Sequence, residues 1–375
     1  MFKRSRHVYI SRLLILGSLL FVFLNALPLI PESFFPIDDK DLVDIPQIAT
    51  ASFTKAIKAS FRMGTHIDFY PIRDLSYWVD VHLFEGNIHG DIGTTFRITN
   101  FFLFALSAFI LVSALTALGC NFLTSAITVS LWVILPNHFE MIWWIAARKD
   151  LLALLFSLLS FRFFLSFQKS QSNWAAFLCL LTFGLGLLSK ASFSLLPLIG
   201  LTGVFFIPKM RNSKVFFVLV FAVLMGFSWI GIQRSFYSTY NDMRFWYPFS
   251  YRYRGAIEAL GRMVIGIVWA PVNSIDVFNW GNWTERNREY FWPGVMFSFL
   301  FCVLFFSSVL KKRPHFWLPM ASCLVLYLPI SALFFPHRNF YSVRYFEPPL
   351  VALFFTLPFF SQKFRDSAKK AIYSF

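Results

Sequence analysis

The sequence predicts an all-α, polytopic membrane protein with about ten transmembrane helices and large extracytoplasmic loops. Of its 375 residues, 57% are hydrophobic and only 14% are charged, and Phe alone occurs 51 times. A soluble chain of this size could not bury so much apolar surface. Apolar runs of roughly 17–22 residues recur along the chain, as a membrane-crossing helix requires. A β-barrel would instead show alternation over segments of about ten residues, so we exclude it.

Hydropathy places the expected helices in order. The first covers 8–30 and has no cleavage site, so we expect a retained helix rather than a signal peptide. The others are expected at 96–117, 122–141 and 151–168, on both sides of Ser189 and Lys190, and at 215–233, 294–310, 315–334 and 345–361. The segment 256–270 is moderately apolar but carries Glu258 and Arg262, and we expect it to be re-entrant or interfacial. Residues 1–361 thus form one transmembrane domain, followed by a basic cytoplasmic tail at 362–375.

Charge is distributed unevenly along the chain, whose net charge is +15. Ten of the 19 acidic residues lie between Glu32 and Asp91. Basic residues cluster at 3–6, 209–211, 311–313 and 363–370. The positive-inside rule puts these clusters in the cytoplasm and the loops 31–95 and 234–293 outside. We therefore expect an integral membrane protein whose large loops lie outside the cytoplasm, with no nucleic-acid partner.

Both large loops combine aromatic side chains with basic ones. In the first, we expect a helix at 47–62, because Phe53, Ile57 and Phe61 recur on one side and basic residues on the other. This pattern is typical of a helix that lies on a membrane surface. The second loop, 234–293, has seven arginines and no lysine, interleaved with Tyr and Trp. Such a composition suits sugar stacking and phosphate pairing, and it equally suits a loop at the membrane interface.

Two acidic residues, Asp38 and Asp39, follow the first expected helix at the membrane face. A carboxylate in that place could take a proton from an acceptor hydroxyl as a general base. A solvated acidic turn has the same sequence, so spacing alone leaves both interpretations open.

Ionisable side chains are concentrated where the third and fourth expected helices meet. This cluster consists of His138, Glu140, Arg148, Lys149 and Asp150. Ionisable groups cost about 2.5–3.5 kcal/mol each at the membrane centre, so a cluster at its boundary points to function. Arg and Lys suit a phosphate. The alternative is a belt of snorkelling side chains anchored by the neighbouring tryptophans. Lys190 and Arg344 add two cations, each at the outer end of an expected helix.

Taken in order, these segments resemble the membrane part of the tetratricopeptide-repeat transmembrane O-mannosyltransferases, which belong to the GT-C glycosyltransferases. The most specific match is to the family block HPxHxExVxWIAxRxDLLAxLF, where the chain has Pro136, His138, Glu140, Trp144, Ile145, Ala146, Arg148, Asp150, Leu151 and Leu152. Four other matches are weaker. Asp38 and Asp39 correspond to a DD pair of the family, and residues 71–76 with Asn100 correspond to an RPL…S patch that is followed by Asn. Residues 188–190 correspond to the family motif LSKE, and residues 343–348 to ERYLYLPS. The resemblance covers residues 34–350 and includes no tetratricopeptide repeats.

The resemblance implies a GT-C-like bundle and inverting transfer of a sugar, such as mannose, from a polyprenyl phosphate to a hydroxyl of a protein or glycan acceptor. It implies Asp38 as general base, with Asp39 as its alternative. It also implies donor-phosphate binding by Arg148, Lys149, Lys190 and Arg344, and substrate orientation by His138, Glu140, Asp150 and Asn100. The location it implies is a bacterial inner membrane, with the active site facing the periplasm or exterior. We expect no cofactor beyond the lipid-linked sugar, and no metal, because a single carboxylate pair offers no evident third ligand.

The chain departs from the family pattern at five positions. Tyr70, Arg97, Leu135, Ala191 and Val343 stand where the family has Arg, His, His, Glu and Glu. Other functions stay open: a lipid-linked glycan ligase or lipid A-modifying transferase, a transporter or flippase of lipid-linked sugars, and a non-catalytic scaffold. A transporter should place ionisable groups near mid-membrane, whereas this sequence concentrates them at one face.

Overall fold

The computed structural model describes residues 2–27, 51–62, 69–84, 92–135, 138–206, 212–240, parts of 254–265, 290–311, 313–327 and 347–355. Within these ranges every regular element is a helix and none is a strand, which confirms the all-α class. Several predicted features lie outside the described residues: Asp38, Asp39, Arg344, the tail 362–375 and most of the loop 234–293.

Five of the described helices are long and apolar enough to cross a membrane. They are α1 (Phe2–Ala26), α6 (Ile92–Ala117), α9 (Arg148–Ser170), α12 (Ser213–Tyr240) and α15 (Phe291–Leu310). Shorter helices accompany them: α7 (Phe122–Val133), α10 (Asn173–Ser189), α11 (Leu196–Phe206), α16 (Pro314–Tyr327) and α17 (Glu347–Phe354). The described residues therefore support a membrane protein, with five spans of full length where the sequence predicts about ten.

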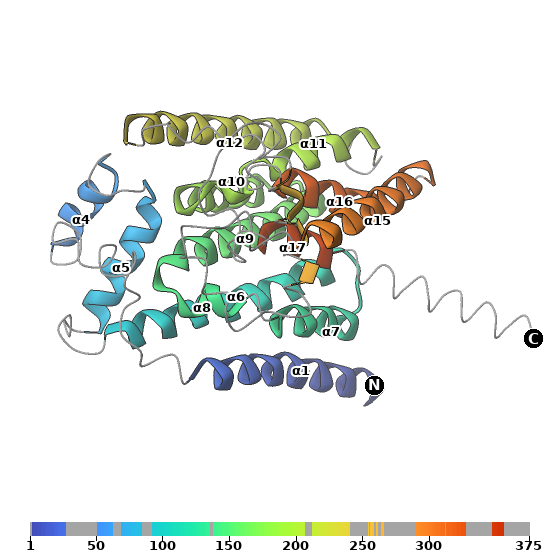
Figure 1. Cartoon of the computed structure of the whole chain (residues 1–375), viewed down its shortest axis with the longest axis horizontal. Helices are drawn as coiled ribbons and strands as arrows, with labels where there is room; N and C mark the ends of the chain where they lie inside the picture. The colour runs from blue at the N-terminus through green and yellow to red at the C-terminus, as the bar shows by residue number, and fades with distance from the viewer. Residues whose placement is uncertain are drawn as a thin grey trace, which may run out of the picture.

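The long helices lie side by side (Figure 1), and side-chain contacts fix their directions. α6 and α9 are parallel, because Arg148 at the start of α9 bonds Asn100 near the start of α6, whereas Arg162 bonds Ser113 near their other ends. α10 returns antiparallel to α9 after a short turn, and Lys190 after its last residue pairs with the start of α9. One end of the bundle thus collects the starts of α6 and α9 and the end of α10.

α5 (Pro71–Leu83) and α4 (Phe53–Ser60) lie at this same end, opposite the N-terminus of α1 (Figure 1). Pro71 is the first residue of α5, a position that needs no intrahelical N–H donor. The Gln233 side chain of α12 donates to the Phe69 carbonyl oxygen at 2.8 Å, which fixes the chain just before α5 to the bundle. α12 therefore holds the chain just before α5, and the starts of α6 and α9 contact α5 after its first turn.

The helix expected at 47–62 is shorter in the structure, where α4 has only eight residues. Ala56 is buried against α5, while Phe53, Lys55 and Lys58 are exposed. An exposed ring beside exposed lysines is the surface that contact with lipid headgroups requires. Its placement on the membrane surface stays a prediction.

The prediction of one continuous helix over 122–141 is wrong. α7 ends at Val133, α8 covers His138–Trp143, and the 3-10 turn η2 (Ile145–Ala147) leads into α9. Pro136 explains the break, because proline lacks the N–H donor of a helix and disfavours helical geometry at the residue before it. As a consequence, α9 begins at Arg148 rather than at 151 and carries Arg148, Lys149 and Asp150 of the cluster in its first turn, whereas His138 and Glu140 lie on α8.

Other boundaries differ less. α6 begins at Ile92 instead of 96, and α12 continues to Tyr240, so the first residues of the predicted loop 234–293 are helical. The segment expected to be re-entrant is helical at its described positions between 254 and 265. A Cβ atom at Gly261 would lie 1.9 Å from the Tyr290 carbonyl oxygen, so this segment meets the start of α15 backbone to backbone. Small residues permit such crossings between membrane helices.

α12 makes a similar close approach to the turn before α11. A Cβ atom at Gly226 would lie 2.2 Å from the Ser194 carbonyl oxygen, too close for any non-bonded contact, whereas one at Gly231 would meet nothing within 4 Å. We expect Gly226→Ala to lower the free energy of unfolding by about 1–3 kcal/mol, the usual cost of overpacking. Gly231→Ala, on the same helix, is the matched control and should be neutral or slightly stabilising. Thermal unfolding in detergent measures both, and equal midpoints would contradict the close crossing.

Candidate functional site

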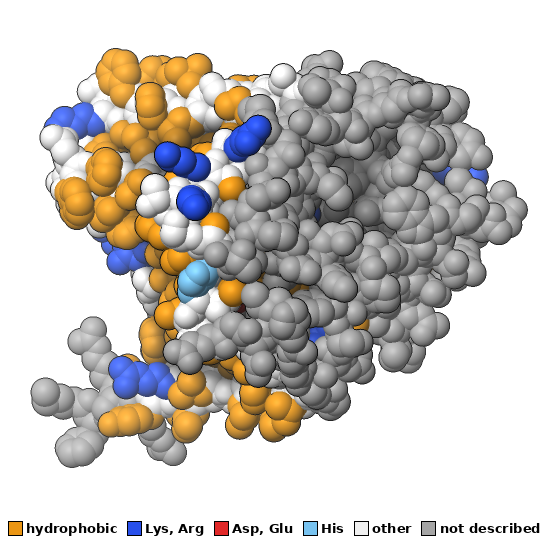
Figure 2. Space-filling view, turned by 90° about the vertical axis from the view of Figure 1, so that its left-hand side faces the viewer, with side chains coloured by type: hydrophobic (Ala, Val, Ile, Leu, Met, Phe, Trp, Pro, Cys, Tyr) orange, Lys and Arg blue, Asp and Glu red, His pale blue; other side chains and the backbone are white. Residues whose placement is uncertain are grey.

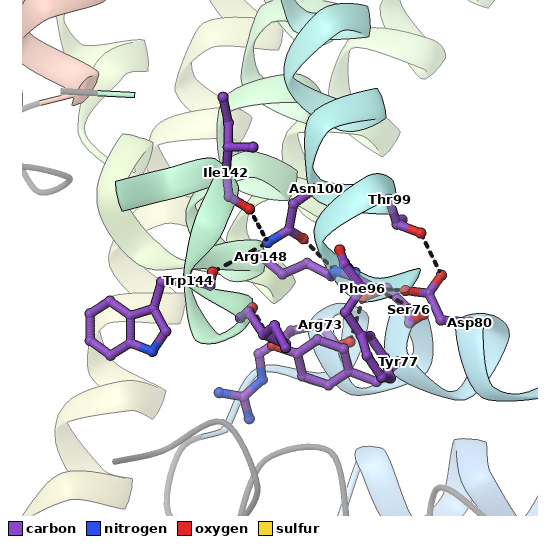
Figure 3. A network of polar contacts seen from close by, with 11 residues as sticks. Arg73, Ser76, Tyr77, Asp80, Phe96, Thr99, Asn100, Ile142, Trp144 and Arg148 are labelled. Atoms are coloured by element: carbon purple, nitrogen blue, oxygen red, sulfur yellow. Dashed lines mark hydrogen bonds and ion pairs between the residues drawn. The ribbon is translucent and has the colours of Figure 1, made fainter. Parts of the chain in front are cut away.

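Arg148 is the centre of a polar network at the α5 end of the bundle. It is fully buried, and its side chain extends between Asn100 of α6 and Asp80 of α5 (Figure 3). Nε donates to the Asn100 side-chain oxygen at 2.8 Å, and Nη2 donates to the Phe96 carbonyl oxygen at 2.7 Å. Nη1 pairs with the Asp80 carboxylate and reaches the Ser76 carbonyl oxygen at 3.4 Å. Every guanidinium nitrogen is therefore engaged by protein oxygen atoms.

The surroundings of this charge are apolar apart from these partners. The guanidinium carbon lies 5.0 Å from the ring centre of Tyr77 and 5.3 Å from that of Phe96. Thr99 donates to the other oxygen of Asp80 at 3.1 Å. Burial raises the pKa of the Asp80 carboxyl above its ordinary value of 3.8, against the opposing effect of the Arg148 charge. The two ions are thus held by each other and by the polar atoms around them, because bulk water does not solvate them.

The corner between α8 and α9 is held by the same residues. Asn100 donates to the carbonyl oxygens of Ile142, at 3.3 Å, and of Trp144, at 3.2 Å. Arg97 donates to the Trp143 carbonyl oxygen at 3.0 Å, and Tyr77 donates to that of Ile145 at 2.9 Å. The carbonyl groups of Ile142 and Trp143, in the last turn of α8, have no partner within the helix, and side chains of α6 satisfy them. Those of Trp144 and Ile145 accept a backbone N–H of the next turn as well as a side chain of α5 or α6.

Two lysines lie at the border of this network. Lys190 pairs with Asp150 in the first turn of α9, and its side chain is 11% exposed. The Lys149 ammonium lies 5.2 Å from the ring centre of Tyr70, just before α5, and the residue is partly exposed. The structure thus brings Lys190 to the start of α9, beside Lys149 and Asp150.

The remaining predicted residues are placed as follows. His138 is fully buried on α8 and packs between Trp132 and Phe104, with its Nε2 2.6 Å from the Trp132 carbonyl oxygen. This position on the inner side of the corner suits packing better than contact with a substrate. Glu140 is partly buried on the same helix. Asp38, Asp39 and Arg344 lie outside the described residues, so their roles stay predictions.

Sequence reasoning missed Asp80, the partner of Arg148, and the part played by Tyr77. Both are buried on one face of α5 together with Arg73, at a spacing of four and three residues. Arg73 and Asp74 pair on this helix at 2.8 Å. The signal was available, because the positions 73, 77 and 80 fall on one side of a helix. Because charged residues usually face solvent, a helix side that carries Arg73 and Asp80 is expected to be exposed, and the sequence alone does not indicate its burial.

The described part of the surface at this end carries basic side chains among apolar ones. Figure 2 shows the face in question, where Lys and Arg side chains stand out among hydrophobic ones. Exposed basic residues of α4 and of the turn after it, Lys55, Lys58 and Arg62, belong to this end of the molecule. Within the described ranges, no three His, Cys, Asp or Glu side chains converge in a way that could hold a metal ion.

Comparison with known proteins leaves the resemblance untested. No protein-family model matches the chain, and no curated protein or solved structure matches it. The function of the chain must therefore be inferred from its own residues and their geometry.

The buried ion pair predicts a strong coupling between α5 and α9. We expect Arg148→Gln to lower the free energy of unfolding by about 3–5 kcal/mol, because it leaves the Asp80 carboxylate buried without its cation. The double variant Arg148→Gln with Asp80→Asn should cost less than the sum of the single changes. Thermal unfolding in detergent measures all three. Lys149→Gln, one residue away and partly exposed, is the control, and an Arg148→Gln midpoint equal to it would contradict the coupling.

Proposed function

We propose that the protein is a membrane glycosyltransferase that moves a sugar from a polyprenyl phosphate to an acceptor hydroxyl, on the side of the membrane where α4 and α5 lie. By the resemblance, the bundle is of the GT-C type with about ten spans, the sugar is a hexose such as mannose, and the acceptor is a protein or a glycan. By the positive-inside rule, the basic clusters at the opposite ends of the helices favour an extracytoplasmic position for this side.

One observation carries the proposal. Segments that match the family in separate parts of the sequence meet in one place. Arg148 of the central block contacts Asn100, which matches the Asn at the second helix, and Ser76, which matches the RPL…S patch. Asp150 of the same block pairs with Lys190 of the LSKE match. Chance matches scattered over a membrane protein would have no reason to converge at one end of the bundle.

The geometry divides the predicted roles. Arg148 and Asn100 have their polar atoms engaged within the protein, so we assign them to positioning rather than to donor binding. Lys149 and Lys190, which are partly exposed, are the described cations that suit a lipid phosphate. Asp150 orients Lys190 and balances its charge when no phosphate is present.

The proposed reaction is a displacement at the anomeric carbon of the sugar, with inversion of its configuration. The acceptor oxygen forms a bond to the anomeric carbon as the bond from that carbon to the phosphate oxygen breaks. The acceptor proton passes to Asp38, and the polyprenyl phosphate leaves with the bonding electrons. Positive charge from Lys149, Lys190 and Arg344 stabilises the charge that develops on the leaving phosphate.

The reaction is tested by transfer of labelled sugar from a panel of polyprenyl-phosphate donors in membranes that contain the protein. We expect one donor to be consumed, and Asp38→Asn to reduce transfer by about 10²–10⁴-fold, the usual worth of a general base. Asp39→Asn is made alongside to decide which acid of the pair is the base. Asp44→Asn, in the same loop, is the control and should keep full activity.

Folded wild-type protein that consumes no donor would sink the transferase proposal. The next assay would then be flipping of lipid-linked sugars across vesicles, the function of a transporter. Donor consumption that survives both aspartate changes would keep the enzyme class and overturn the choice of base.

The lysine assignment predicts a change in donor affinity. We expect Lys149→Gln to raise the KM for the polyprenyl-phosphate sugar by about 10–100-fold, because a hydrogen bond to a charged group contributes about 1.5–3 kcal/mol. Lys58→Gln on α4, an exposed lysine of the same end, should leave the KM within about threefold of wild type. Initial rates at varied donor concentration measure both. Equal KM values for the two variants would remove Lys149 from the donor site.

A further inference from the structure

A second cation lies inside the membrane-spanning part of α9, far from the site described above. Arg162 is partly buried, and its Nε donates to the Ser113 hydroxyl of α6 at 2.9 Å. Among the described residues, that is its single hydrogen bond, and no carboxylate pairs with it. Since a guanidinium does not lose its proton in a protein, this charge needs an anion or water.

Among the described residues, the helices that pack on α9 offer no anion near Arg162. The sequence has no acidic residue in 92–139 or in 151–240, which cover α6, α7, α10, α11 and α12. α6 and α10 are the helices that pack most extensively on α9. The nearest acid along α9 is Asp150, three turns away at the opposite end and already paired with Lys190. These helices therefore leave the charge of Arg162 to water or to an anion from elsewhere.

The depth of Arg162 in the membrane follows from helix register. Ser160 of α9 bonds the Cys179 carbonyl oxygen of α10 at 2.8 Å, and the two helices are antiparallel. Trp174, five residues before Cys179, is therefore level with Leu165 of α9. Trp174 is 67% exposed and stacks on Phe177 near the start of α10, as a tryptophan at a membrane interface does. Arg162 lies about 5 Å further inside, within reach of the phosphate layer.

The face of α9 that carries Arg162 continues toward that layer. Ser166 and Lys169 follow at spacings of four and seven residues, so all three fall on one side of the helix. Ser166 is partly buried and Lys169 is exposed. Ser113 holds the guanidinium by Nε, which leaves both Nη groups available for a bidentate contact with phosphate oxygens.

We propose that Arg162, oriented by Ser113 and assisted by Lys169, binds the phosphate of an anionic membrane lipid in the leaflet opposite the candidate active site. The lipid's acyl chains would lie along the apolar surface of the bundle while its headgroup reaches Lys169. This site is separate from the proposed transferase reaction and does not depend on it.

Native mass spectrometry of the full-length protein in detergent tests the site. The protein is given equal amounts of phosphatidylglycerol and phosphatidylcholine, and the lipid that stays bound is quantified. We expect wild type to retain phosphatidylglycerol preferentially, and Arg162→Gln to weaken its retention about tenfold. Ser113→Ala should weaken it less, because it removes the orienting hydroxyl and keeps the charge. This second variant keeps the test decisive if Arg162→Gln does not fold.

Arg12→Gln is the matched control. The ring of Phe23 on α1 lies 5.0 Å from that of Phe101 on α6. Counted along the helices from this contact, Arg12 is about as far as Ser113, so Arg12 and Arg162 lie at about the same depth. Arg12 is exposed on α1 and has no hydroxyl partner among the described residues. Equal loss of phosphatidylglycerol in both arginine variants, or no loss in either, would overturn the site.

Two competitors, each added to protein with bound phosphatidylglycerol, identify the source of the phosphate. A polyprenyl phosphate that displaces phosphatidylglycerol from wild type but not from Arg162→Gln would assign the site to that lipid class. Displacement of the phospholipid by millimolar inorganic phosphate would overturn a lipid site, because a free anion would then suffice.

Discussion

The buried charge of Arg148 is the constraint on which the α5 end of the molecule depends. An unpaired guanidinium in an apolar interior costs several kcal/mol, so the charge persists only where a carboxylate and polar atoms meet it together. Asp80 supplies the carboxylate from α5, and Asn100 and the Phe96 carbonyl group supply the polar atoms from α6. Three segments that are far apart in sequence are thereby forced into one arrangement. Removal of any one of them would leave a buried polar group without its partner.

The same network also determines the positions of Lys149 and Lys190. Arg148 opens α9, so the network that fixes Arg148 fixes the first turn of the helix, where Lys149 and Asp150 follow. Asn100 reaches from the same network to the corner that leads into α9. Lys190 then meets Asp150 because α10 returns antiparallel to α9. The partly exposed cations are therefore placed by groups that are themselves buried, which is the arrangement expected where a ligand must be held in one position.

Sequence reasoning reached the helical class and the place of the cluster, and it failed where a distant partner decides the outcome. Hydropathy located α1, α6, α9, α12 and α15, because membrane-length apolar runs are a strong local signal. Pro136 was also a local signal, for the end of a helix, but the apolar residues on both sides of it suggested one continuous helix. The role of Arg148 could not be predicted, since Asp80 lies 68 residues away and an arginine beside a membrane suits a phosphate equally well.

Arg148 and Arg162, the two arginines of α9, show what decides whether an arginine has a structural role or binds a ligand. Both lie on the side of α9 that packs on α6, and since the helices are parallel, each meets α6 at the corresponding level. At the α5 end, α5 covers the helix ends and contributes a carboxylate, so the charge of Arg148 is neutralised within the protein. At the other end, the adjoining helices α6 and α10 contain no acidic residue, and Arg162 is partly exposed. There we propose that a lipid phosphate neutralises the equivalent charge. Whether an arginine in this bundle is structural or binds a ligand therefore depends on which acidic residues its neighbouring helices carry, a property that single positions in the sequence do not reveal.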